Sequence, residues 1–538
     1  MAEVQTREAT EGDVEEIREI FHETYGDDYP FRDFYDTEWL KRAVYSDRVL
    51  MVVAQEGANG PILGTGSVDL DTGSHSDLLG EFGRLVVKPQ ARGRGVGRAI
   101  MAFRVDLVEP RLHVGIVENR TAHPYSQRIS THFHFSPAGF LALKHRFQER
   151  ESVVLFARHF GPGLELRRNR PRVSPLVAPL AHLAMANLGM EPDVIVDESE
   201  PPYPPDLEFT LSEFESQGLP HLLRIERGRV RHREVFGPIR LHYGFFRLAA
   251  RQASYLVARR PGAPREAVAG ALGFLHDPVE RNIRIFELIA ASDQAIHFLF
   301  QSLLDRARAL GVEYIEVDVS GHSPRLQRTL LALGFVPAAY MPAMVFHEVD
   351  RLDVVKMIHL SVPLPPKPPE MVESAEPIFQ LVHTAIRREQ ALPALEREME
   401  ELALFHGLAK EQGQRLAGAM TVRNFSEGHQ LFRAGEQAHD LFVLLSGRVQ
   451  IEEPSGRELV VLDQGTTVGE VAMLTQAVHS ASARAQTPLR TAVLTQEALD
   501  QLTALRPDVA ILLYRNLARE LGGKLKGADA AIRGLGRE

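Results

Sequence analysis

The segment GRLVVKPQARGRGVGRAIM, residues 83–101, decides the fold of the N-terminal part of this chain. A β-branched strand runs directly into a turn with glycines at 93, 95 and 97 and arginines at 92, 94 and 98, and a helix is expected from about residue 94. Glycines permit close backbone approach, successive N–H groups can point into one concavity, and the helix adds its positive N-terminal end. The segment therefore predicts a turn that cradles a diphosphate.

The spacing of the glycines disfavours a dinucleotide-binding fold. The fingerprint G-x-G-x-x-G needs a glycine three places after Gly95, and Arg98 stands there. A glycine-rich turn that only packs is the remaining alternative, but it does not explain why three arginines and Gln90 gather at the same point.

The pattern around this segment predicts a mixed α/β domain. Asp13 can cap a helix whose apolar residues fall on one face, and a hairpin is expected around the turn GANG at 57–60. Further strands are expected at 81–87, 111–119 and 151–160, with a helix from about 123. The middle of the chain repeats the closing order at 283–290, 294–311, 312–320, 324–334 and 335–346, which suggests an internal duplication.

Proline- and glycine-rich stretches divide the chain into blocks. A break follows residue 160, and VPLPPKPPE at 362–370 predicts a semi-rigid spacer. Residues 371–415 look helical. The expected domains are 1–162, a second unit at 163–361 with a partly helical connector, a linker and helix at 362–399, and a last domain at 400–538.

Composition limits the functional classes. The chain has 538 residues and no cysteine, which excludes disulfides and cysteine nucleophiles and fits a reducing compartment. We find no apolar run of 18 residues and no signal core, so we expect a cytoplasmic protein without a transmembrane segment. The net charge of −10 argues against nucleic acid as a partner.

Strand, Q-x-x-G-x-G and helix together resemble the signature of the GNAT acetyltransferase superfamily, and ENRTAHPYSQ at 118–127 fits the same family. The resemblance covers residues 5–160 and implies acetyl-CoA or another acyl-CoA as the coenzyme. It implies that strand backbone groups meet the pantetheine and that the turn holds the pyrophosphate. The residues concerned are Leu85, Val86, Val87, Gln90, Ala91, Arg92, Gly93, Arg94, Gly95, Val96, Gly97, Arg98 and Asn119.

Attack of an amine on a thioester needs a proton acceptor and a proton donor for the departing thiolate. Glu81 and Glu118 are the possible acceptors, and we prefer Glu81, although a plain surface carboxylate is an equal alternative. In the family the donor is commonly a Tyr on the helix after the second strand. Here Tyr125 is one place out of register and Ser126 takes the expected position, so either hydroxyl is a possible donor.

Three histidines invite a metal hypothesis that we set aside. His132 and His134 are two places apart on an expected helix and would point in different directions, and His123 adds no standard ligand set. We therefore expect no metal site.

The middle block resembles a second GNAT unit that has lost its cradle. The stretch from IFELIAASD to QAIHFLF lacks a glycine for close approach and lacks arginine, so we expect no productive coenzyme binding there. Completing the substrate cleft, docking on the first copy and recognising the substrate are its possible roles.

Residues from about 400 to 525, including VGEVAMLTQAVHSASARA at 468–485, resemble a cyclic nucleotide-binding domain, a β jelly roll with flanking helices. The resemblance implies contacts to cAMP or cGMP from Gly469, Glu470, Val471, Ala472, His479, Ser480 and Ser482. His479 stands where the family has its phosphate arginine, so Arg484 or another group would have to substitute. Another ligand, or an unliganded dimerising module, is the alternative.

The last helix has Val509, Leu513, Leu517 and Leu521 near four-residue spacing, which predicts a core-facing stripe or a homodimer contact. We expect no DNA-reading segment after this helix. The leading hypothesis is a GNAT-type N-acyltransferase for a protein lysine or small amine, regulated allosterically by the last domain. The rivals are a long-chain N-acyl amino acid or lipid synthase and a non-catalytic nucleotide sensor or scaffold.

Overall fold

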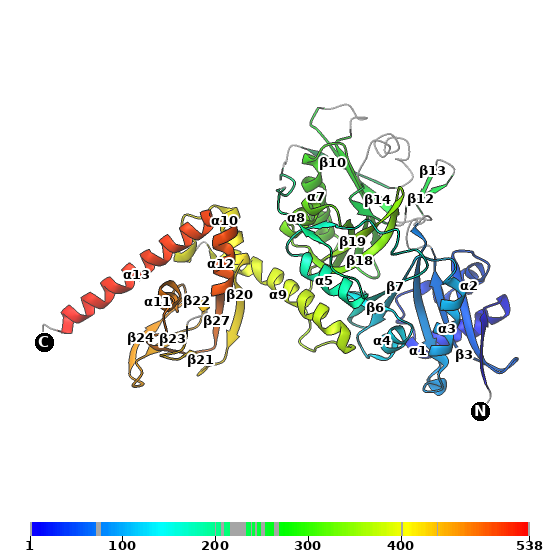
Figure 1. Ribbon diagram of the computed structural model, residues 1–538, viewed down its shortest axis with the longest axis horizontal. Coiled ribbons are helices and arrows are strands. Elements are labelled where there is room, and N and C mark those ends of the chain that lie inside the picture. The colour runs from blue at the N-terminus through cyan, green and yellow to red at the C-terminus, as the bar shows by residue number, and fades with distance from the viewer. Residues whose placement is uncertain are drawn as a thin grey trace. The chain divides into compact units, whose positions relative to one another are not determined.

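The computed structural model describes residues 3–70, 77–199, 201–205, 209–215, 233–237, 239–242, 245–248, 253–262, 268–399, 402–437 and 440–535. The chain divides into two compact units, Met1–Thr384 and Ala385–Glu538 (Figure 1). The first unit is mixed α/β and the second is rich in β-strands. Both classes agree with the sequence analysis.

The first half of the N-terminal unit follows the predicted order of elements. It contains β1 (Val4–Glu8), α1 (Val14–Tyr25), α2 (Thr37–Val44), β2 (Val49–Glu56), β3 (Ile62–Asp69), β4 (Leu79–Val87), α3 (Val96–Val108), β5 (Val114–Arg120), α4 (Tyr125–His132), β6 (Ser136–Arg146) and β7 (Arg150–His159). The apolar residues of α1, which are Val14, Ile17, Ile20 and Phe21, are all buried.

Two local details differ from the sequence analysis. The carboxylate of Asp13 does not cap α1; it accepts hydrogen bonds from the backbone and hydroxyl of Thr10 and pairs with Arg7. Strand β6 escaped notice because Pro137 and Gly139 interrupt its apolar run, and its pairing with β7 shifts register at Gly139.

The second half repeats the same order of elements. After the connector, with β8 (Arg172–Val173), α5 (Ala178–Asn187) and β9 (Ile195–Val196), come β10 (Thr210–Glu215), β11 (Val235–Phe236), β12 (Ile239–His242), β13 (Phe245–Leu248), β14 (Ala253–Arg259), β15 (Gly270–Asp277), β16 (Asn282–Ala290), α7 (Gln294–Ala309), β17 (Tyr314–Ser320), α8 (Pro324–Ala332), β18 (Val336–His347) and β19 (Asp350–Leu360). In β14 to β19 the hairpins and the parallel pair repeat those of β2 to β7.

One continuous sheet joins the two halves. Its strand order is β1-β2-β3-β4-β5-β7-β6-β18-β19-β17-β16-β15-β14-β10, with β11 attached to β17. The halves meet where β6 pairs with β18 at Gly139 and Ala339. The backbones lie so close there that a Cβ on Gly139 would stand 2.1 Å from the Cβ of Ala339.

The C-terminal unit is a β jelly roll with helices packed against it. Its two four-stranded sheets have the orders β20-β27-β22-β25 and β21-β26-β23-β24. The strands are β20 (Thr421–Phe425), β21 (Gln430–Phe432), β22 (Asp440–Ser446), β23 (Val449–Glu452), β24 (Glu458–Leu462), β25 (Thr467–Val468), β26 (Ser482–Ala485) and β27 (Leu489–Thr495). The helices are α10 (Lys410–Gly418), α11 (Glu470–Thr475), α12 (Gln496–Leu505) and α13 (Pro507–Leu535).

The helical stretch predicted for 371–415 is broken. Helix α9 (Glu376–Met399) ends before a short 3₁₀ turn at Ala403–Phe405, and α10 begins at Lys410. Helix α9 therefore starts in the first unit and ends in the second.

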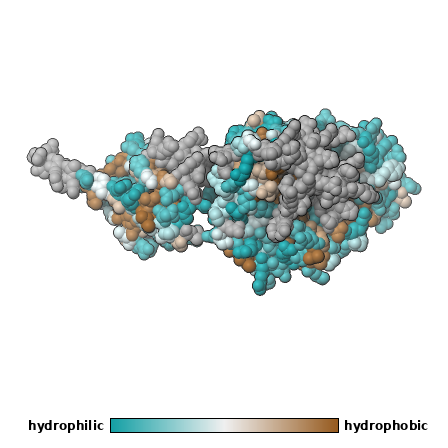
Figure 2. All heavy atoms as spheres, turned by 90° about the horizontal axis from the view of Figure 1, so that it is seen from above, coloured by the Kyte–Doolittle hydropathy of each residue, from teal (hydrophilic) through white to brown (hydrophobic). Residues whose placement is uncertain are grey.

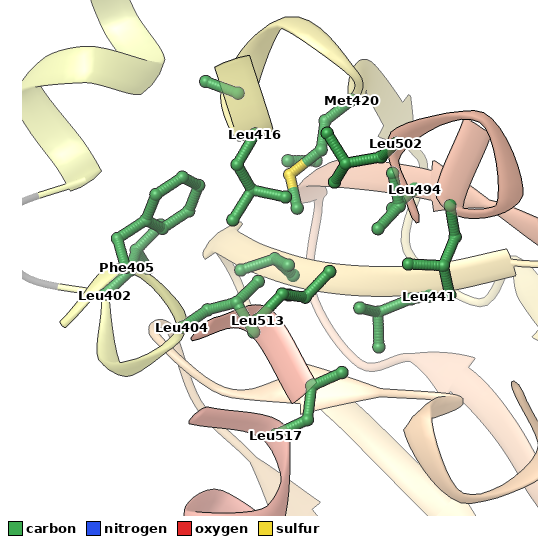
Figure 3. Packing of buried hydrophobic residues seen from close by; sticks show 14 of the residues in the cluster. Leu402, Leu404, Phe405, Leu416, Met420, Leu441, Leu494, Leu502, Leu513 and Leu517 are labelled. Carbon is green, nitrogen blue, oxygen red and sulfur yellow. The ribbon is translucent and has the colours of Figure 1, made fainter. Parts of the chain in front are cut away.

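The stripe on the last helix faces the core of its own unit. Val509, Leu513 and Leu517 are fully buried in a cluster with Leu441 of β22 and Leu494 of β27 (Figure 3). Leu521 is half-buried. The core-facing alternative accounts for the three buried residues.

The view in Figure 2 shows a mainly hydrophilic surface with scattered small apolar patches. Across the residues that the structure describes, no helix is long and apolar enough to cross a membrane.

Candidate coenzyme and effector sites

The two parallel strands β4 and β5 separate along their length. They pair only at Leu79 with Val114, Gly80 with Gly115 and Glu81 with Ile116. Beyond Glu81 the other edge of β4 still pairs with β3 at Gly83, Val86 and Val87. Among the described residues, the edge of β4 that faces β5 has no strand partner from Phe82 to Val87, so an extended chain such as pantetheine can bind its backbone groups.

The glycine turn lies at the end of this open edge. Gly93 and Gly95 have φ of 78° and 81°, the left-handed region that favours glycine, and Gly95 caps α3. The first helical hydrogen bond runs from the N–H of Ala99 to the carbonyl of Gly95. The N–H groups of Val96, Gly97 and Arg98 therefore precede it and can receive an anion.

The three arginines of the turn differ in what they contact. Arg94 pairs with Glu56 of β2 at 2.5 Å, so part of its charge is already balanced. Arg92 and Arg98 are exposed, and among the described residues no carboxylate pairs with them. They are the better cations for a diphosphate.

Sequence reasoning missed Arg104, which shapes the open edge. This α3 residue is 1% exposed and donates to the carbonyls of Ser67 and Gly83, beside the point where the β3–β4 register shifts. Burial, and then the charge of Arg84, lower the pKa of Arg104 to about 9. The signal in the sequence was a cation on the otherwise apolar face Ile100, Met101, Val105 and Val108.

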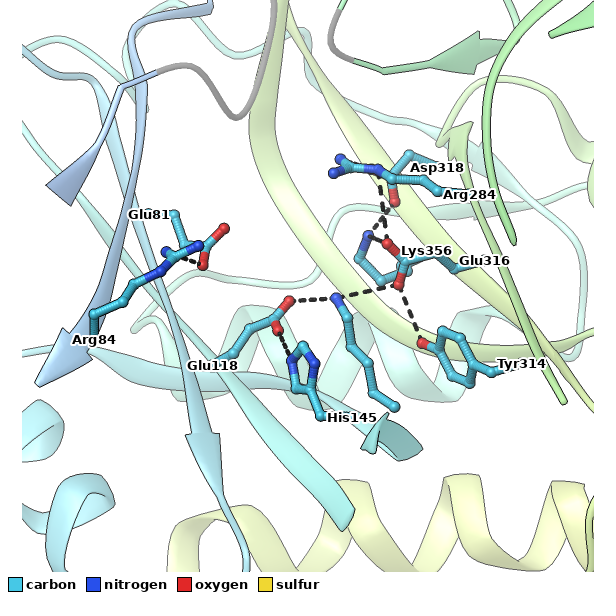
Figure 4. Close-up of polar contacts among 10 residues, drawn as sticks. Glu81, Arg84, Glu118, His145, Arg284, Tyr314, Glu316, Asp318 and Lys356 are labelled. Carbon is cyan, nitrogen blue, oxygen red and sulfur yellow. Dashed lines mark hydrogen bonds and ion pairs between the residues drawn. The ribbon is translucent and has the colours of Figure 1, made fainter. Parts of the chain in front are cut away.

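The two candidate bases have different surroundings (Figure 4). Glu118 is bound by Lys144 at 2.5 Å and by His145 at 2.9 Å. Burial alone would raise the pKa of Glu118, but the charges of Lys144 and His145 outweigh it and hold that pKa well below its usual range. Glu81 has one ion pair, from its Oε1 to Arg84 at 2.8 Å, and among the described residues its Oε2 has no partner. Glu81 is thus the more available proton acceptor.

The pair formed by Glu118 and Lys144 continues into the second half of the unit. Lys144 reaches Glu316 of β17 at 3.2 Å, and Lys356 of β19 pairs with Asp318 at 2.6 Å (Figure 4). Burial would raise the pKa of Glu316, yet Lys144, Lys356 and Arg284 lower it to about 2. These buried charges compensate one another across the junction between the halves.

The two candidate thiolate donors lie in the first turn of α4. Tyr125 is 65% exposed, and its ring lies 5.0 Å from that of His123, centroid to centroid, with an angle of 40° between the planes; Ser126 is half-buried. Three places along, Ile129 stands 3.1 Å from the position of a Cβ on Gly97, so α4 lies against the glycine turn. The role of either hydroxyl, that of Tyr125 or that of Ser126, as the proton donor to the thiolate stays a prediction.

Asn119 has a role that the sequence did not indicate. It is 2% exposed, and its side-chain amide donates to the hydroxyl of Ser130 at 2.9 Å. This contact fixes α4 to β5, and a direct contact of Asn119 with coenzyme stays a prediction.

The histidine geometry was partly wrong in the sequence analysis. His132 is the last residue of α4, but His134 lies beyond the helix at a φ of 61°. His123 precedes the helix. Among the described residues no group of three or more potential ligands could hold a metal ion.

The corresponding gap in the second half is filled by the chain itself. Strands β16 and β17 also pair only at one end, from Asn282 with Tyr314 to Ile285 with Val317. Strand β11 then pairs with β17, Val235 opposite Val319 and Phe236 opposite Asp318. A Cβ on the next residue, Gly237, would stand 2.6 Å from the Cα of Phe286 in β16. The second half therefore lacks the glycine turn, and in addition its gap is occupied by its own backbone.

In the C-terminal unit, His479 lies beside the start of α11. Gly469, which caps α11, has a φ of 91°, and the His479 ring stands 3.6 Å from the position of a Cβ there. The ring stacks on Phe432 at 3.7 Å with an angle of 9° between the planes. Val471 and Ser480 are exposed, Ala472 is buried, and the Ser482 hydroxyl accepts from the N–H of Ala434.

Two charged side chains near this site already have protein partners. Glu470 is 6% exposed and pairs with Lys524 of α13 at 2.6 Å. Arg484 pairs with Glu452 at 3.5 Å and donates to the carbonyl of Gly428. A ribose hydroxyl would have to compete with Lys524 for Glu470, and Arg484 is already engaged by Glu452 and by the carbonyl of Gly428.

Two family models match this chain. Residues 14–134 match the acetyltransferase (GNAT) family, and residues 422–505 match the cyclic nucleotide-binding domain. The chain therefore contains a GNAT acetyltransferase domain and a cyclic nucleotide-binding domain.

Relatives cover only parts of the chain. Glutaminase 2 of Bradyrhizobium diazoefficiens is 32% identical over 132 residues, 24% of this chain and 21% of that protein. The CRP-like cAMP-activated global transcriptional regulator of Mycobacterium tuberculosis is 30% identical over 122 residues, 22% of this chain and 54% of that protein. The crystal structure of the Thermus thermophilus catabolite activator protein is 30% identical, covers 25% of this chain and 63% of that chain, and has a TM-score of 0.22. This chain thus spans about a fifth of the first relative and about half of the second.

Proposed function

We propose that this protein is an acyl-CoA-dependent N-acyltransferase, with acetyl-CoA as donor and a protein lysine or small amine as acceptor, regulated by its cyclic nucleotide-binding domain. The observation that carries the proposal is the left-handed glycine turn at the end of the open edge of β4. Backbone donors, Arg92 and Arg98 converge there, as a diphosphate requires.

In this proposal the coenzyme supplies an activated thioester, and the chain positions it and moves protons. The backbone of Leu85 to Val87 aligns the pantetheine along β4. Oε2 of Glu81 takes the proton of the acceptor amine, directly or through water. The hydroxyl of Ser126 or Tyr125 donates a proton to the departing thiolate.

The first experiment is calorimetric titration with acetyl-CoA, followed by mass spectrometry of an acceptor panel of lysine peptides and small amines. Binding together with mass increases of one acetyl group would support the proposal. Binding without transfer to any acceptor would favour a scaffold, and palmitoyl transfer would favour the long-chain alternative.

Replacing Glu81 by glutamine should lower kcat by about a hundredfold, because a general base contributes on this order. The KM for acetyl-CoA should stay near the wild-type value, since Glu81 precedes the turn. Steady-state kinetics with a fixed acceptor measures both constants. The same substitution at Glu118 is the comparison, and a larger kcat loss there would reverse the assignment of the base.

For the effector site we propose cAMP or cGMP as the ligand, with His479 as a weakened phosphate contact. His479→Arg should tighten cyclic nucleotide binding by about tenfold or more, because a charged hydrogen bond contributes roughly 1.5–3 kcal/mol. Calorimetry with cAMP and cGMP checks this, with His479→Gln as the control. Unchanged affinity in the arginine variant would count against a cyclic phosphate at this place.

Three further assignments belong to this proposal. Residues 163–361 form a second GNAT-like domain without coenzyme, supported by the repeated element order and the filled gap. A homodimer is supported by Ile511, Tyr514 and Leu525 on the exposed side of α13. A cytoplasmic location is supported by the cysteine-free sequence.

A further inference from the structure

A buried glutamine on α4 binds a distant segment of the chain. Gln127 is fully buried, and its amide nitrogen donates to the carbonyls of Arg120 and Glu370 at 3.1 and 3.0 Å. Its amide oxygen accepts from the N–H of Val372 at 3.0 Å. The N–H of Glu370 in turn donates to the carbonyl of Thr121 at 2.8 Å. We call this set of four hydrogen bonds the Gln127 clasp.

The second half of the unit has the same device in the same place. Gln327 on α8 is fully buried, donates to the carbonyl of Ser320 at 3.0 Å and accepts from the N–H of Ser174 at 2.9 Å. Arg120 and Ser320 each end a strand, and each glutamine follows its strand end by seven positions. Each half therefore uses this glutamine to hold an incoming segment.

The segments held by Gln127 and Gln327 lead to different parts of the chain. Ser174 lies in the connector within the first unit. Val372 lies shortly before α9, which runs from Glu376 to Met399 and so continues into the C-terminal unit. The first part of α9 is anchored, since Ile378, Phe379 and Val382 are buried and Phe379 packs edge-on against Phe140 at 5.0 Å.

The Gln127 clasp also lies next to the candidate chemistry. Gln127 directly follows Tyr125 and Ser126, and Ser130, one turn later, binds Asn119 of β5. Gln127 and Ser130 are the two buried residues of α4, and both are polar. A shift of the segment at 370–372 would therefore act on the helix that carries the proposed proton donor.

We propose that Gln127 is a positioning residue that couples the segment leading to the cyclic nucleotide-binding domain to the proton donor on α4. The enzymatic part of this inference rests on the proposed function. The clasp itself can be tested without turnover.

The variant for this test is Gln127→Glu, which keeps the shape of the side chain but removes both N–H donors. Amide hydrogen exchange of the full chain should be at least about tenfold faster in 125–132 and 370–375. The free energy lost with buried hydrogen bonds corresponds to a change of this order in the exchange rate. The matched control is Gln327→Glu, in which the change should appear in 324–332 and near Ser174 but not in 125–132. Unchanged exchange in 125–132 of the first variant would refute the coupling whether or not the protein is an enzyme.

Kinetics then tests the positioning role. Gln127→Glu should lower kcat for acetyl transfer by about tenfold with the KM for acetyl-CoA nearly unchanged, and added cAMP should no longer alter kcat. Gln327→Glu should keep the wild-type response to cAMP. If both variants lose activity equally, or if Gln127→Glu changes only KM, the positioning role is wrong. A wild type without any turnover would refute the proposed function, and the exchange result would still decide the clasp.

A second variant distinguishes loss of the clasp from a general folding defect. Val372 has φ of −77° and ψ of 151°, which proline can adopt, so Val372→Pro removes one N–H donor and leaves Gln127 intact. It should show the same changes as Gln127→Glu but smaller, about threefold, because one hydrogen bond of the clasp is lost. A Val372→Pro protein with wild-type exchange and kinetics would contradict the proposal.

Discussion

Acetyl-CoA should no longer bind measurably when Gly93 and Gly95 are both replaced by aspartate. The two residues have φ of 78° and 81°, the left-handed region that residues with a side chain rarely adopt and that aspartate, like asparagine, enters more easily than most. The new carboxylates would also stand where the diphosphate is expected and repel it. Together these effects predict a loss of affinity of at least about a thousandfold, measured by calorimetry.

The surroundings of the two glycines provide the control. Apart from the neighbouring residues in the chain, no atom of the described residues lies within 4 Å of a Cβ built at either position, so the substitutions meet no clash there. Gly95→Asn is the matched variant, because asparagine tolerates the left-handed region and has no charge. It should bind acetyl-CoA better than Gly95→Asp. Equal affinity of the double aspartate variant and wild type would show that the coenzyme does not bind at this turn.

Replacing Gly139 by alanine should destabilise the N-terminal unit by about 3 kcal/mol, because one methyl group overfills the junction between the halves. The new Cβ would meet the Cβ of Ala339 at 2.1 Å and its Cα at 2.6 Å. Neither atom of Ala339 can rotate out of the way, since the Cα is part of the backbone and the Cβ is bonded directly to it. Urea unfolding followed by a probe in the N-terminal unit measures the change, because two units need not unfold together.

Two further variants separate the clash from a general effect of alanine. Gly12→Ala makes the same change where the nearest atom is 3.7 Å away, and it should alter the free energy of unfolding by less than about 0.5 kcal/mol. Ala339→Gly combined with Gly139→Ala removes the facing methyl group and should recover part of the loss. Additive effects of the two substitutions would contradict a direct contact.

Local patterns in the sequence predicted the elements whose signals are local. The turn at 90–98 combined a strand, glycines and a helix within a few residues, and the α1 face followed its apolar spacing. Strand β6 was missed because Pro137 and Gly139 interrupt its apolar run, and the pairing of Gly139 with β18 is a long-range contact that no local pattern records.

The candidate site was predictable in residue types but not in pairings. The sequence offers both Glu81 and Glu118 as proton acceptors with a preference for Glu81, and only the fold brings Lys144 and His145 onto Glu118. The partner of Gln127 lies 243 positions away, and a lone glutamine on a helix gives no sign of it. Burial of Arg104 likewise depends on the carbonyls of two neighbouring strands.

Strand β11 bears on how much coenzyme the protein takes up. The N-terminal unit has two halves of the same element order, yet in the second half the gap between the two parallel strands holds a piece of the chain's own backbone. A binding isotherm should therefore saturate at one coenzyme per chain of 60.0 kDa and show no second phase. The sheet of the second half is completed by a segment of the same chain, so its completion does not depend on the concentration of a ligand.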